Sequence, residues 1–267
     1  MGLLTVDVTA LGIVMSSDSQ PIEIVSGSIA VPDFGGERRR DKIIERRGGG
    51  FDGLIGYVGT EQIGSETARA FIERLSREEP ALPLAEFSEF LAEELSRAWV
   101  EHDLATGLWI FIAGTEDGEP RFWFAVNCDF AGGLYTNVRP AFTAVNDLDE
   151  HAVPRVMREG GFSSKAEVLA NRTLFFRNGA LIPAATIFDD FTGLIERVYV
   201  GGYDGFDRIS TLDDYAYLVL MRQEFIKRMF DNSKGIYGHR NPPIGGVVYV
   251  RGVTAGGEIK EYVKGAI

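Results

Sequence analysis

The order of strand and helix patterns along the chain constrains its fold more than any other feature. Strands show an apolar–polar alternation with a period of two, whereas helices repeat their apolar residues every three to four positions. Strand patterns occupy residues 3–8, 12–17, 42–46, 51–58, 108–113, 121–126, 141–145, 194–200, 246–253 and 259–263. Helix patterns occupy residues 61–78, 84–100 and 165–169, and a further helix begins at Thr211. Two successive helices after a run of strands predict an α+β fold of two stacked sheets with helices outside.

Short polar and glycine-rich segments connect these patterns. The turn 116–119 joins the strands on either side of it, and the spacing predicts a hairpin loop longer than two residues. Asp214 stands three residues after Thr211, which predicts a capping interaction at the start of the last helix. No internal repeat, low-complexity tract or linker divides the chain, so we predict a single domain over residues 1–267.

The chain is acidic. Its 267 residues include 39 Asp and Glu against 27 Lys and Arg, which gives a formal net charge of −12. Nucleic-acid partners need a basic face, and anionic membranes attract basic segments. No apolar run approaches the roughly 20 residues of a membrane span, and the start of the chain lacks the pattern of a signal peptide. We therefore expect no nucleic-acid or membrane partner and a cytoplasmic location.

Cysteine and histidine show no pattern of a metal or redox site. Cys128 is the only cysteine and lies in the apolar stretch FWFAVNCDF, which predicts a buried, inert thiol in a reducing compartment. His102, His151 and His239 are far apart, and their spacing is not that of metal ligands. The glycines of residues 53–59 follow a strand but lack the spacing of a phosphate-binding loop. The sequence therefore predicts no metal and no cofactor.

The first strand begins at the start of the chain. Leu4, Val6 and Val8 share one face of this strand, and the intervening polar residues share the other. The turn 9–12 leads into a second strand that ends in the polar sequence SSDS. Chain ends are usually frayed and tolerant of change. An end that is built directly into a core therefore suggests that the terminus itself has a use.

Three short motifs follow one another in an order typical of a known family. In GIVMSSDSQ a strand is followed by the acidic residue Asp18 and a polar pair, and DKII places Lys42 before bulky apolar residues. The strand LIGYVGT contains Gly56, 14 residues after Lys42. Together with the hairpin IFIAGTEDGEPRFWFAVNCDF, the last helix and the closing strands, these motifs resemble the proteasome β-subunit branch of the N-terminal-nucleophile (Ntn) hydrolases. The resemblance covers about two-thirds of the chain and implies a four-layer αββα sandwich of two mostly antiparallel sheets flanked by helices.

The resemblance also implies a mechanism. In this family the side chain of residue one of the mature chain is the nucleophile, and its α-amine serves as the base. A lysine stabilises the alkoxide, a carboxylate orients that lysine, and a glycine N–H binds the oxyanion. By this resemblance Lys42, Asp18 and Gly56 would fill the last three roles. An ordinary structural ion pair between Asp18 and Lys42 is the alternative.

The sequence departs from the family at the nucleophile. The alternation of the first strand places Gly2 or Leu3 at the position of residue one, and removal of Met1 would expose Gly2, which has no side chain to attack with. Thr5 could become residue one only by cleavage of the bond before it. It would then stand 13 residues before Asp18, against 16 in the family. The expected hydroxyl is therefore either missing or that of Thr5.

Other features of the family are present only in part. The glycine-rich turn 200–205 lacks the auxiliary serine that the family has before its last helix. Asp231 and Ser233 match in kind an Asp and a Ser that close this helix. The stretch 132–184 has no counterpart in the family. We expect this atypical insertion to line a changed substrate cleft or a subunit contact.

Three functions remain open on these grounds. The chain is a proteasome-subunit-like protein that is atypical or catalytically silent, or an active threonine-type peptidase or amidohydrolase with Thr5 as nucleophile, or a non-catalytic binding module that uses the cleft between the sheets. The retained Asp18, Lys42 and Gly56 favour an enzyme, whose substrate would be a peptide or small amide. The missing hydroxyl favours a silent relative. The resemblance implies homo-oligomers, rings among them, built by helix-to-helix contacts.

Overall fold

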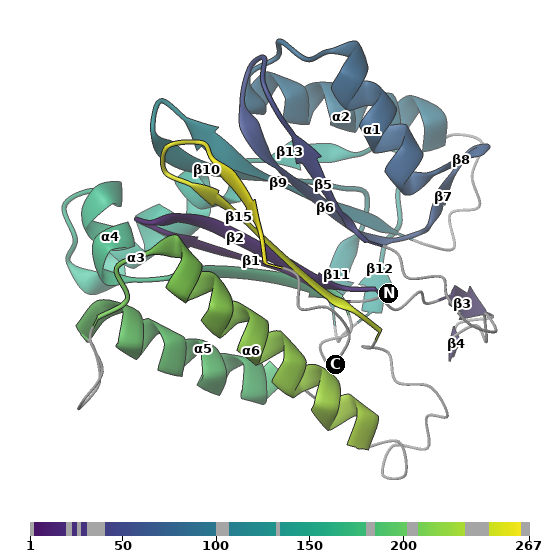
Figure 1. Ribbon diagram of the computed structural model, residues 1–267. Helices are drawn as coiled ribbons and strands as arrows, with labels where there is room; N and C mark the ends of the chain where they lie inside the picture. The colour runs from purple at the N-terminus through teal and green to yellow at the C-terminus, as the bar shows by residue number, and fades with distance from the viewer. Residues whose placement is uncertain are drawn as a thin grey trace.

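Two five-stranded antiparallel sheets form the centre of the protein (Figure 1). The structure is a computed structural model that describes residues 3–19, 23–25, 28–30, 41–99, 107–131, 134–179, 185–201, 208–232 and 246–262. The first sheet consists, in spatial order, of β14 (Leu174–Gly179), β1 (Leu3–Thr9), β2 (Gly12–Asp18), β15 (Val248–Thr254) and β16 (Ile259–Glu261). The second sheet consists of β13 (Thr143–Val145), β10 (Glu119–Val126), β9 (Leu108–Glu116), β6 (Asp52–Gly59) and β5 (Ile43–Arg46).

Helices cover the outer face of each sheet (Figure 1). α1 (Ala68–Glu78) and α2 (Leu84–Trp99) pack on the second sheet, whereas α5 (Ala185–Gly201) and α6 (Leu212–Asn232) pack on the first. The shorter elements are β3 (Glu23–Val25), β4 (Ser28–Ala30), β7 (Gln62–Ile63), β8 (Glu66–Thr67), β11 (Asp129–Ala131), β12 (Leu134–Thr136), the π-helical turn η1 (Leu148–Ala152), α3 (Val153–Gly160) and α4 (Lys165–Asn171). This succession of layers confirms the predicted αββα sandwich.

Three apolar cores hold the four layers together. Tyr57 and Leu95 belong to the core under α1 and α2, Met15 and Phe111 to the core between the sheets, and Val14 to the core under α5 and α6. All five are buried, and full burial of such a side chain contributes about 1.5–3 kcal/mol. The neighbours Val14 and Met15 lie in different cores because successive residues of a strand face opposite sides of its sheet.

The hairpin of β1 and β2 determines what lies at the start of the described chain. The even-numbered residues of β1 join the core between the sheets, as the alternation predicts, whereas Asp7 contacts α6. The pairing places Leu4 opposite Ser17. Because the turn closes the other end of the hairpin, Leu3 and Asp18 meet at its open end.

The stretch 194–200 is helical, which corrects the predicted strand. It belongs to α5, in which Ile195 and Tyr199 are buried against the first sheet. The β-branched residues Val198 and Val200 favoured a strand. Phe191, Ile195, Val198 and Tyr199 nevertheless all pack in the core under the first sheet. Their spacing of three to four residues puts them on one face of a helix, whereas a strand would turn Val198 to the opposite face from the other three. Tertiary packing therefore overrides the local preference.

The helix predicted over 61–78 begins only at Ala68. The residues before it form the short hairpin of β7 and β8, in which Gly64 has a φ of +59°. A positive φ interrupts a right-handed helix, and glycine adopts it without steric cost. Thr67 then caps α1, because its side chain accepts a hydrogen bond from a backbone N–H of the first turn.

A hairpin turn and a helix cap test two further sequence predictions. The loop between β9 and β10 contains only Asp117 and Gly118, so the prediction of a longer loop is wrong. Both residues have a positive φ, 53° and 78°, as two-residue hairpin turns of type I′ require. The predicted cap of α6 is confirmed, since the Asp214 N–H donates to the Thr211 hydroxyl at 3.1 Å.

The stretch 132–184 contributes to both sheets over its described residues 134–179. β13 is an edge strand of the second sheet, and β14 is an edge strand of the first through its pairing with β1. Val153 of α3 and Val168 of α4 join the core between the sheets. The described part of this segment therefore extends the sheets and closes their common core.

Candidate functional site

Asp18 and Lys42 form a buried ion pair at the open end of the β1–β2 hairpin. The Lys42 Nζ lies 3.3 Å from the Asp18 Oδ1. The same oxygen accepts a hydrogen bond of 2.7 Å from the Leu3 backbone N–H. The side chains of Lys42 and Asp18 are only 3% and 1% exposed, so the pair is poorly screened by water. The first described residue of the chain is therefore bonded to a carboxylate that also holds an ammonium group.

The groups of this pair come from both sheets. Asp18 is the last residue of β2 in the first sheet, and Lys42 directly precedes β5, an edge strand of the second sheet. The Lys42 carbonyl accepts a hydrogen bond from the Tyr57 N–H of β6 at 3.2 Å, which holds its backbone against the second sheet. The ion pair therefore bridges the two sheets at the point where β1 begins, β2 ends and β5 begins.

Gly56 lies inside the second sheet, where the two sheets approach each other closely. A Cβ atom at this position would lie 2.6 Å from the Leu4 Cδ1 and 2.7 Å from the Met15 Sδ. Because the neighbouring Tyr57 N–H points toward β5, the alternation of an antiparallel strand points the Gly56 N–H toward β9. This donor therefore faces away from the strand that Lys42 precedes, and glycine is required here for packing.

Gly59, the last residue of β6, was not singled out from the sequence. Its φ is +131°, and an added Cβ would lie 2.2 Å from the backbone oxygen of Gly107. The alternation gives its N–H the same direction as that of Tyr57, toward the edge where β5 begins at Ile43. The only sequence signal for it is its place at the end of the strand, just before a turn.

Thr5 lies in the interior of β1 and is fully buried. Its hydroxyl is 2.6 Å from the Ser16 hydroxyl of β2. It also accepts hydrogen bonds from the side chains of Gln223, at 3.1 Å, and Arg222, at 3.2 Å. Both partners belong to α6, so this hydroxyl lies in a polar network between the first sheet and its helix layer.

A second buried ion pair forms the centre of this network. Arg222 donates to both carboxylate oxygens of Asp7, at 2.6 and 2.9 Å, and both side chains are 0% exposed. The Tyr215 hydroxyl donates to the same carboxylate at 3.2 Å. Burial, followed by the charge of Asp7, raises the pKa of Tyr215 well above its usual range. In the sequence, Asp7 is distinguished only by its place among the polar residues of the first strand.

Three predicted site residues cannot be compared with this geometry. Gly2 and Ser233 lie outside the described residues. Asp231 belongs to α6, but its side chain lies outside what the structure describes. The structure therefore brings together Asp18, Lys42 and the leading end of β1.

Other features of the described residues are unremarkable for catalysis. The Trp109 indole N–H donates to the Cys128 Sγ at 3.0 Å, and burial raises the pKa of this thiol to about 11. His151 lies exposed in η1, and His102 and His239 lie outside the described residues.

Among the residues that the structure describes, no three His, Cys, Asp or Glu side chains cluster as metal ligands would. No helix in the same part of the chain has the length and apolarity needed to cross a membrane.

The layer order and the two antiparallel sheets are those of the proteasome-like Ntn fold. One solved structure similar to this chain is the Anbu (Gly-1) mutant from Hyphomicrobium sp. strain MC1, with a TM-score of 0.50 and 14% identity over 98% of this chain and 87% of that one. Another is Anbu (ancestral beta-subunit) from Yersinia bercovieri, with a TM-score of 0.48, 12% identity and the same two coverages. No protein-family model and no curated protein matches the sequence.

Proposed function

We propose that the protein is a proteasome-subunit-like Ntn-fold protein, atypical or catalytically silent at the nucleophile position, that assembles with copies of itself. One observation carries this proposal: the Leu3 N–H is bonded to Asp18, which is ion-paired with Lys42. This contact joins the leading end of β1 to the carboxylate–ammonium pair that the resemblance assigns to an Ntn site. The fold that the chain shares with Anbu supports the same class.

Gly2 fits the nucleophile position best. It precedes Leu3 directly and stands 16 residues before Asp18, the separation that the resemblance gives for residue one. Glycine carries neither a hydroxyl nor a thiol, so its side chain cannot form a covalent intermediate. The proposal of a silent or atypical site rests on this missing group beside a retained Asp18–Lys42 pair.

Thr5 as a processed nucleophile is the alternative, and its environment argues against it. Cleavage before Thr5 would remove Leu3 and Leu4, which are fully buried, and would abolish the hydrogen bond from Leu3 to Asp18. The Thr5 hydroxyl already has three polar neighbours within 3.2 Å. Freeing it for attack would require an opening between the first sheet and α6.

We further propose Gly59, rather than Gly56, as the source of the N–H for an oxyanion. The Gly56 N–H points toward β9 inside the sheet, where it cannot reach a bound group at the end of β1. The Gly59 N–H points toward the edge where Lys42 and β5 begin. A donor for an oxyanion has to face the reacting group rather than a neighbouring strand.

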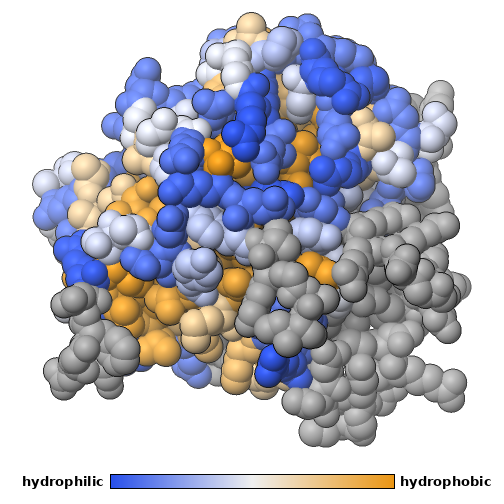
Figure 2. Space-filling view, in the orientation of Figure 1, coloured by the Kyte–Doolittle hydropathy of each residue, from blue (hydrophilic) through white to orange (hydrophobic). Residues whose placement is uncertain are grey.

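Self-assembly is supported by an apolar stripe on the outer helix layer. Its members, spaced four residues apart on α6, are Tyr217, Met221, Phe225 and Met229. Their exposed fractions run from 37% to 59%, and Leu194 of α5 adds a further 42% exposed side chain. Figure 2 shows orange surface over the lower part of the molecule, where Figure 1 places α5 and α6. Contiguous exposed apolar surface of this kind marks interfaces, and helix-to-helix contact with a second copy would bury it.

Intact-mass measurement and light scattering test the proposal directly. We expect a chain mass that begins at Met1 or Gly2, a particle of several copies, and no turnover of fluorogenic peptide amides. A mass that begins at Thr5, together with amide turnover that Lys42→Ala abolishes, would instead establish the alternative of an active hydrolase. Turnover that survives Lys42→Ala would exclude both assignments of the site.

A gain-of-function variant tests the site itself. Gly2→Thr supplies the missing hydroxyl, and intact mass shows whether Met1 has been removed to expose it. We expect this variant to acquire amide turnover that the matched Gly2→Ala variant lacks, because residue 2 directly precedes Leu3, whose N–H is bonded to the carboxylate of the Asp18–Lys42 pair. Addition of Lys42→Ala to Gly2→Thr should abolish the activity. Equal activity in the Thr and Ala variants would contradict the assignment.

A further inference from the structure

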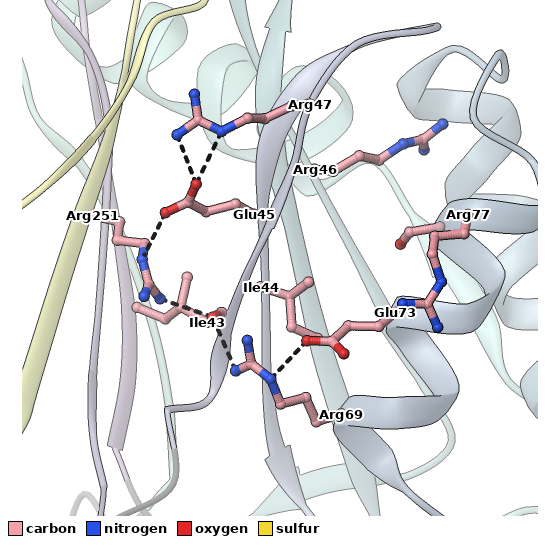
Figure 3. Close-up of a pocket in the computed structure, with 10 residues that line it drawn as sticks. Ile43, Ile44, Glu45, Arg46, Arg47, Arg69, Glu73, Arg77 and Arg251 are labelled. Carbon is pink, nitrogen blue, oxygen red and sulfur yellow. Dashed lines mark hydrogen bonds and ion pairs between the residues drawn. The ribbon is translucent and has the colours of Figure 1, made fainter.

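Arginines gather around a pocket of about 360 Å³ between β5, α1 and β15 (Figure 3). The five that line it are Arg46, Arg47, Arg69, Arg77 and Arg251. The acidic residues in the lining are Glu45 and Glu73. The protein as a whole has a net charge of −12. The lining of this pocket therefore differs from the rest of the protein in having more basic than acidic residues.

The side of the pocket nearest β15 is electrically balanced. Arg251 is ion-paired with Asp41 at 2.6 Å, Glu261 at 2.9 Å and Glu45 at 3.1 Å. Arg47 also pairs with Glu45, at 2.7 Å. Figure 3 shows Arg251, Glu45 and Arg47 as one connected row beside β5. Arg251 of β15 thereby joins the first sheet to Glu45 in β5 of the second, and the ion pairs of Arg251 and Arg47 leave little charge for a ligand.

The side of the pocket nearest α1 is not balanced. Arg69 pairs with Glu73 at 2.7 Å, but Arg77, in the last turn of α1, is exposed and has no ion pair within the described part of the chain. Arg46 likewise has no carboxylate partner among the described residues. Within the residues that the structure describes, Arg46 and Arg77 are therefore not neutralised by a carboxylate.

Arg46 contributes a charge that is held in place rather than solvated. Its residue is 3% exposed, and its guanidinium carbon lies 4.2 and 4.0 Å from the ring centres of Phe51 and Phe87. Its Nη2 donates to the carbonyls of Glu79 and Pro80, whereas its buried Nε and Nη1 have no hydrogen-bond partner. Burial lowers the pKa of Arg46 to about 10, so it remains charged at neutral pH.

We propose that this pocket binds a small oxyanion, a phosphate or carboxylate group, on the α1 side, with Arg77 as the contacting residue and Arg46 as a fixed source of positive potential. A guanidinium presents a planar fork of N–H donors that matches either kind of group. The volume is within the range of sites for small ligands. This site is separate from the Asp18–Lys42 pair, and it does not depend on whether that pair is catalytic.

Isothermal titration with inorganic phosphate, and separately with acetate, tests the proposal at constant ionic strength. Arg77→Ala is compared with Arg158→Ala, which removes another exposed arginine from the last turn of a helix, α3. We expect the wild type and Arg158→Ala to bind equally and Arg77→Ala to bind at least fivefold more weakly. Binding of phosphate alone identifies a phosphate site, and binding of acetate alone identifies a carboxylate site. Binding of neither anion overturns the proposal.

A variant that is expected to strengthen anion binding distinguishes a specific site from general charge attraction. Glu73→Gln removes a carboxylate from the lining and removes the shorter of the two ion pairs of Arg69, which keeps its 3.8 Å contact with Asp41. We expect this variant to bind the anion at least threefold more tightly than the wild type. The matched variant Glu159→Gln changes an exposed glutamate of α3, outside the pocket, by the same amount of charge. Equal tightening in both variants, or loss of affinity in Arg158→Ala equal to that in Arg77→Ala, would contradict a site at this pocket.

Discussion

The β1–β2 hairpin carries two buried ion pairs, and they differ in what surrounds them. Asp7 receives both ends of the Arg222 fork and a tyrosine hydroxyl, in the middle of a strand and under a helix. Asp18 lies at the end of its strand, where its Oδ1 lies 3.3 Å from the Lys42 Nζ and accepts a hydrogen bond from the Leu3 N–H. The first pair joins a sheet to its own helix layer, and the second joins the two sheets.

This difference separates a structural pair from a candidate site. Burial and charge are common to both pairs, so neither property identifies function by itself. We call the Asp7–Arg222 pair closed, because Arg222 donates to both carboxylate oxygens of Asp7 and the Tyr215 hydroxyl donates to the same carboxylate. The Asp18–Lys42 pair is bonded to the beginning of a strand, the position at which we propose the silent nucleophile. Position in the chain, more than ion-pair geometry, therefore supports the site assignment.

The largest expected effect is on the closed pair. Asp7→Ala would leave the Arg222 charge buried and uncompensated, which costs about 3–5 kcal/mol in the free energy of unfolding. Urea unfolding followed by circular dichroism measures this loss. The double variant Asp7→Ala/Arg222→Met removes both charges and should recover most of the stability. A loss below about 1 kcal/mol in the single variant would show that the pair is solvated rather than closed.

Removal of one partner from the other pair should cost less. In Lys42→Ala, Asp18 keeps its hydrogen bond from the Leu3 N–H, so we expect a loss of about 1–3 kcal/mol. Lys260→Ala is the control, because this lysine pairs with Asp213 at a partly exposed site where a salt bridge is worth about 0–1 kcal/mol. If Lys42→Ala destabilised the protein as much as Asp7→Ala does, the proposed distinction between the two pairs would fail.

Thr5→Val should have a smaller effect and addresses the nucleophile. The hydroxyl is lost, but the Gln223 side chain keeps its 2.6 Å hydrogen bond to Ser16. We expect a loss of about 1 kcal/mol in urea unfolding. Amide turnover acquired by Gly2→Thr should be retained when Thr5→Val is added. Complete loss of turnover with the fold intact would assign the nucleophile to Thr5.

The smallest effect on stability is expected at the outer surface. Met221→Glu changes an exposed residue of the α6 stripe, so the free energy of unfolding should change by less than about 0.5 kcal/mol. Light scattering should nevertheless show a lower particle mass, because a charge would be placed in the contact between copies. Ala166→Glu on α4 introduces the same charge at another exposed helical position and should leave the mass unchanged. An unchanged mass for Met221→Glu would exclude this stripe as the interface.

Much of the fold could be predicted from local patterns. The alternation of the first strand and the Thr211 cap act over a few residues, and the sequence predicted both. The Thr67 cap and the two-residue turn of Asp117 and Gly118 are equally local, but the sequence patterns predicted an earlier helix start and a longer loop at these places. The helix over 194–200 could not be recognised in this way. Its β-branched residues favour a strand, and burial of Ile195 and Tyr199 against a distant sheet decides the outcome.

The candidate site was predictable only in part. Asp18 and Lys42 were predicted together by resemblance to a family, because no local rule joins residues 24 positions apart in sequence. Gly56 was predicted from the same resemblance, yet the direction of a backbone N–H depends on which neighbours its strand acquires. That direction follows from the pairing with β5 and β9, which a single strand does not contain.

The sequence alone determined the hairpin and its register, because a period of two and a short turn leave one way to bury Leu4, Val6 and Val8. That register brings Leu3 to Asp18 without help from the rest of the chain. Only the tertiary structure decided which charges the hairpin meets. Lys42 belongs to the other sheet, and Arg222 belongs to a helix and stands 215 residues after Asp7. Local spacing does not predict such contacts, because they form only when whole layers pack together.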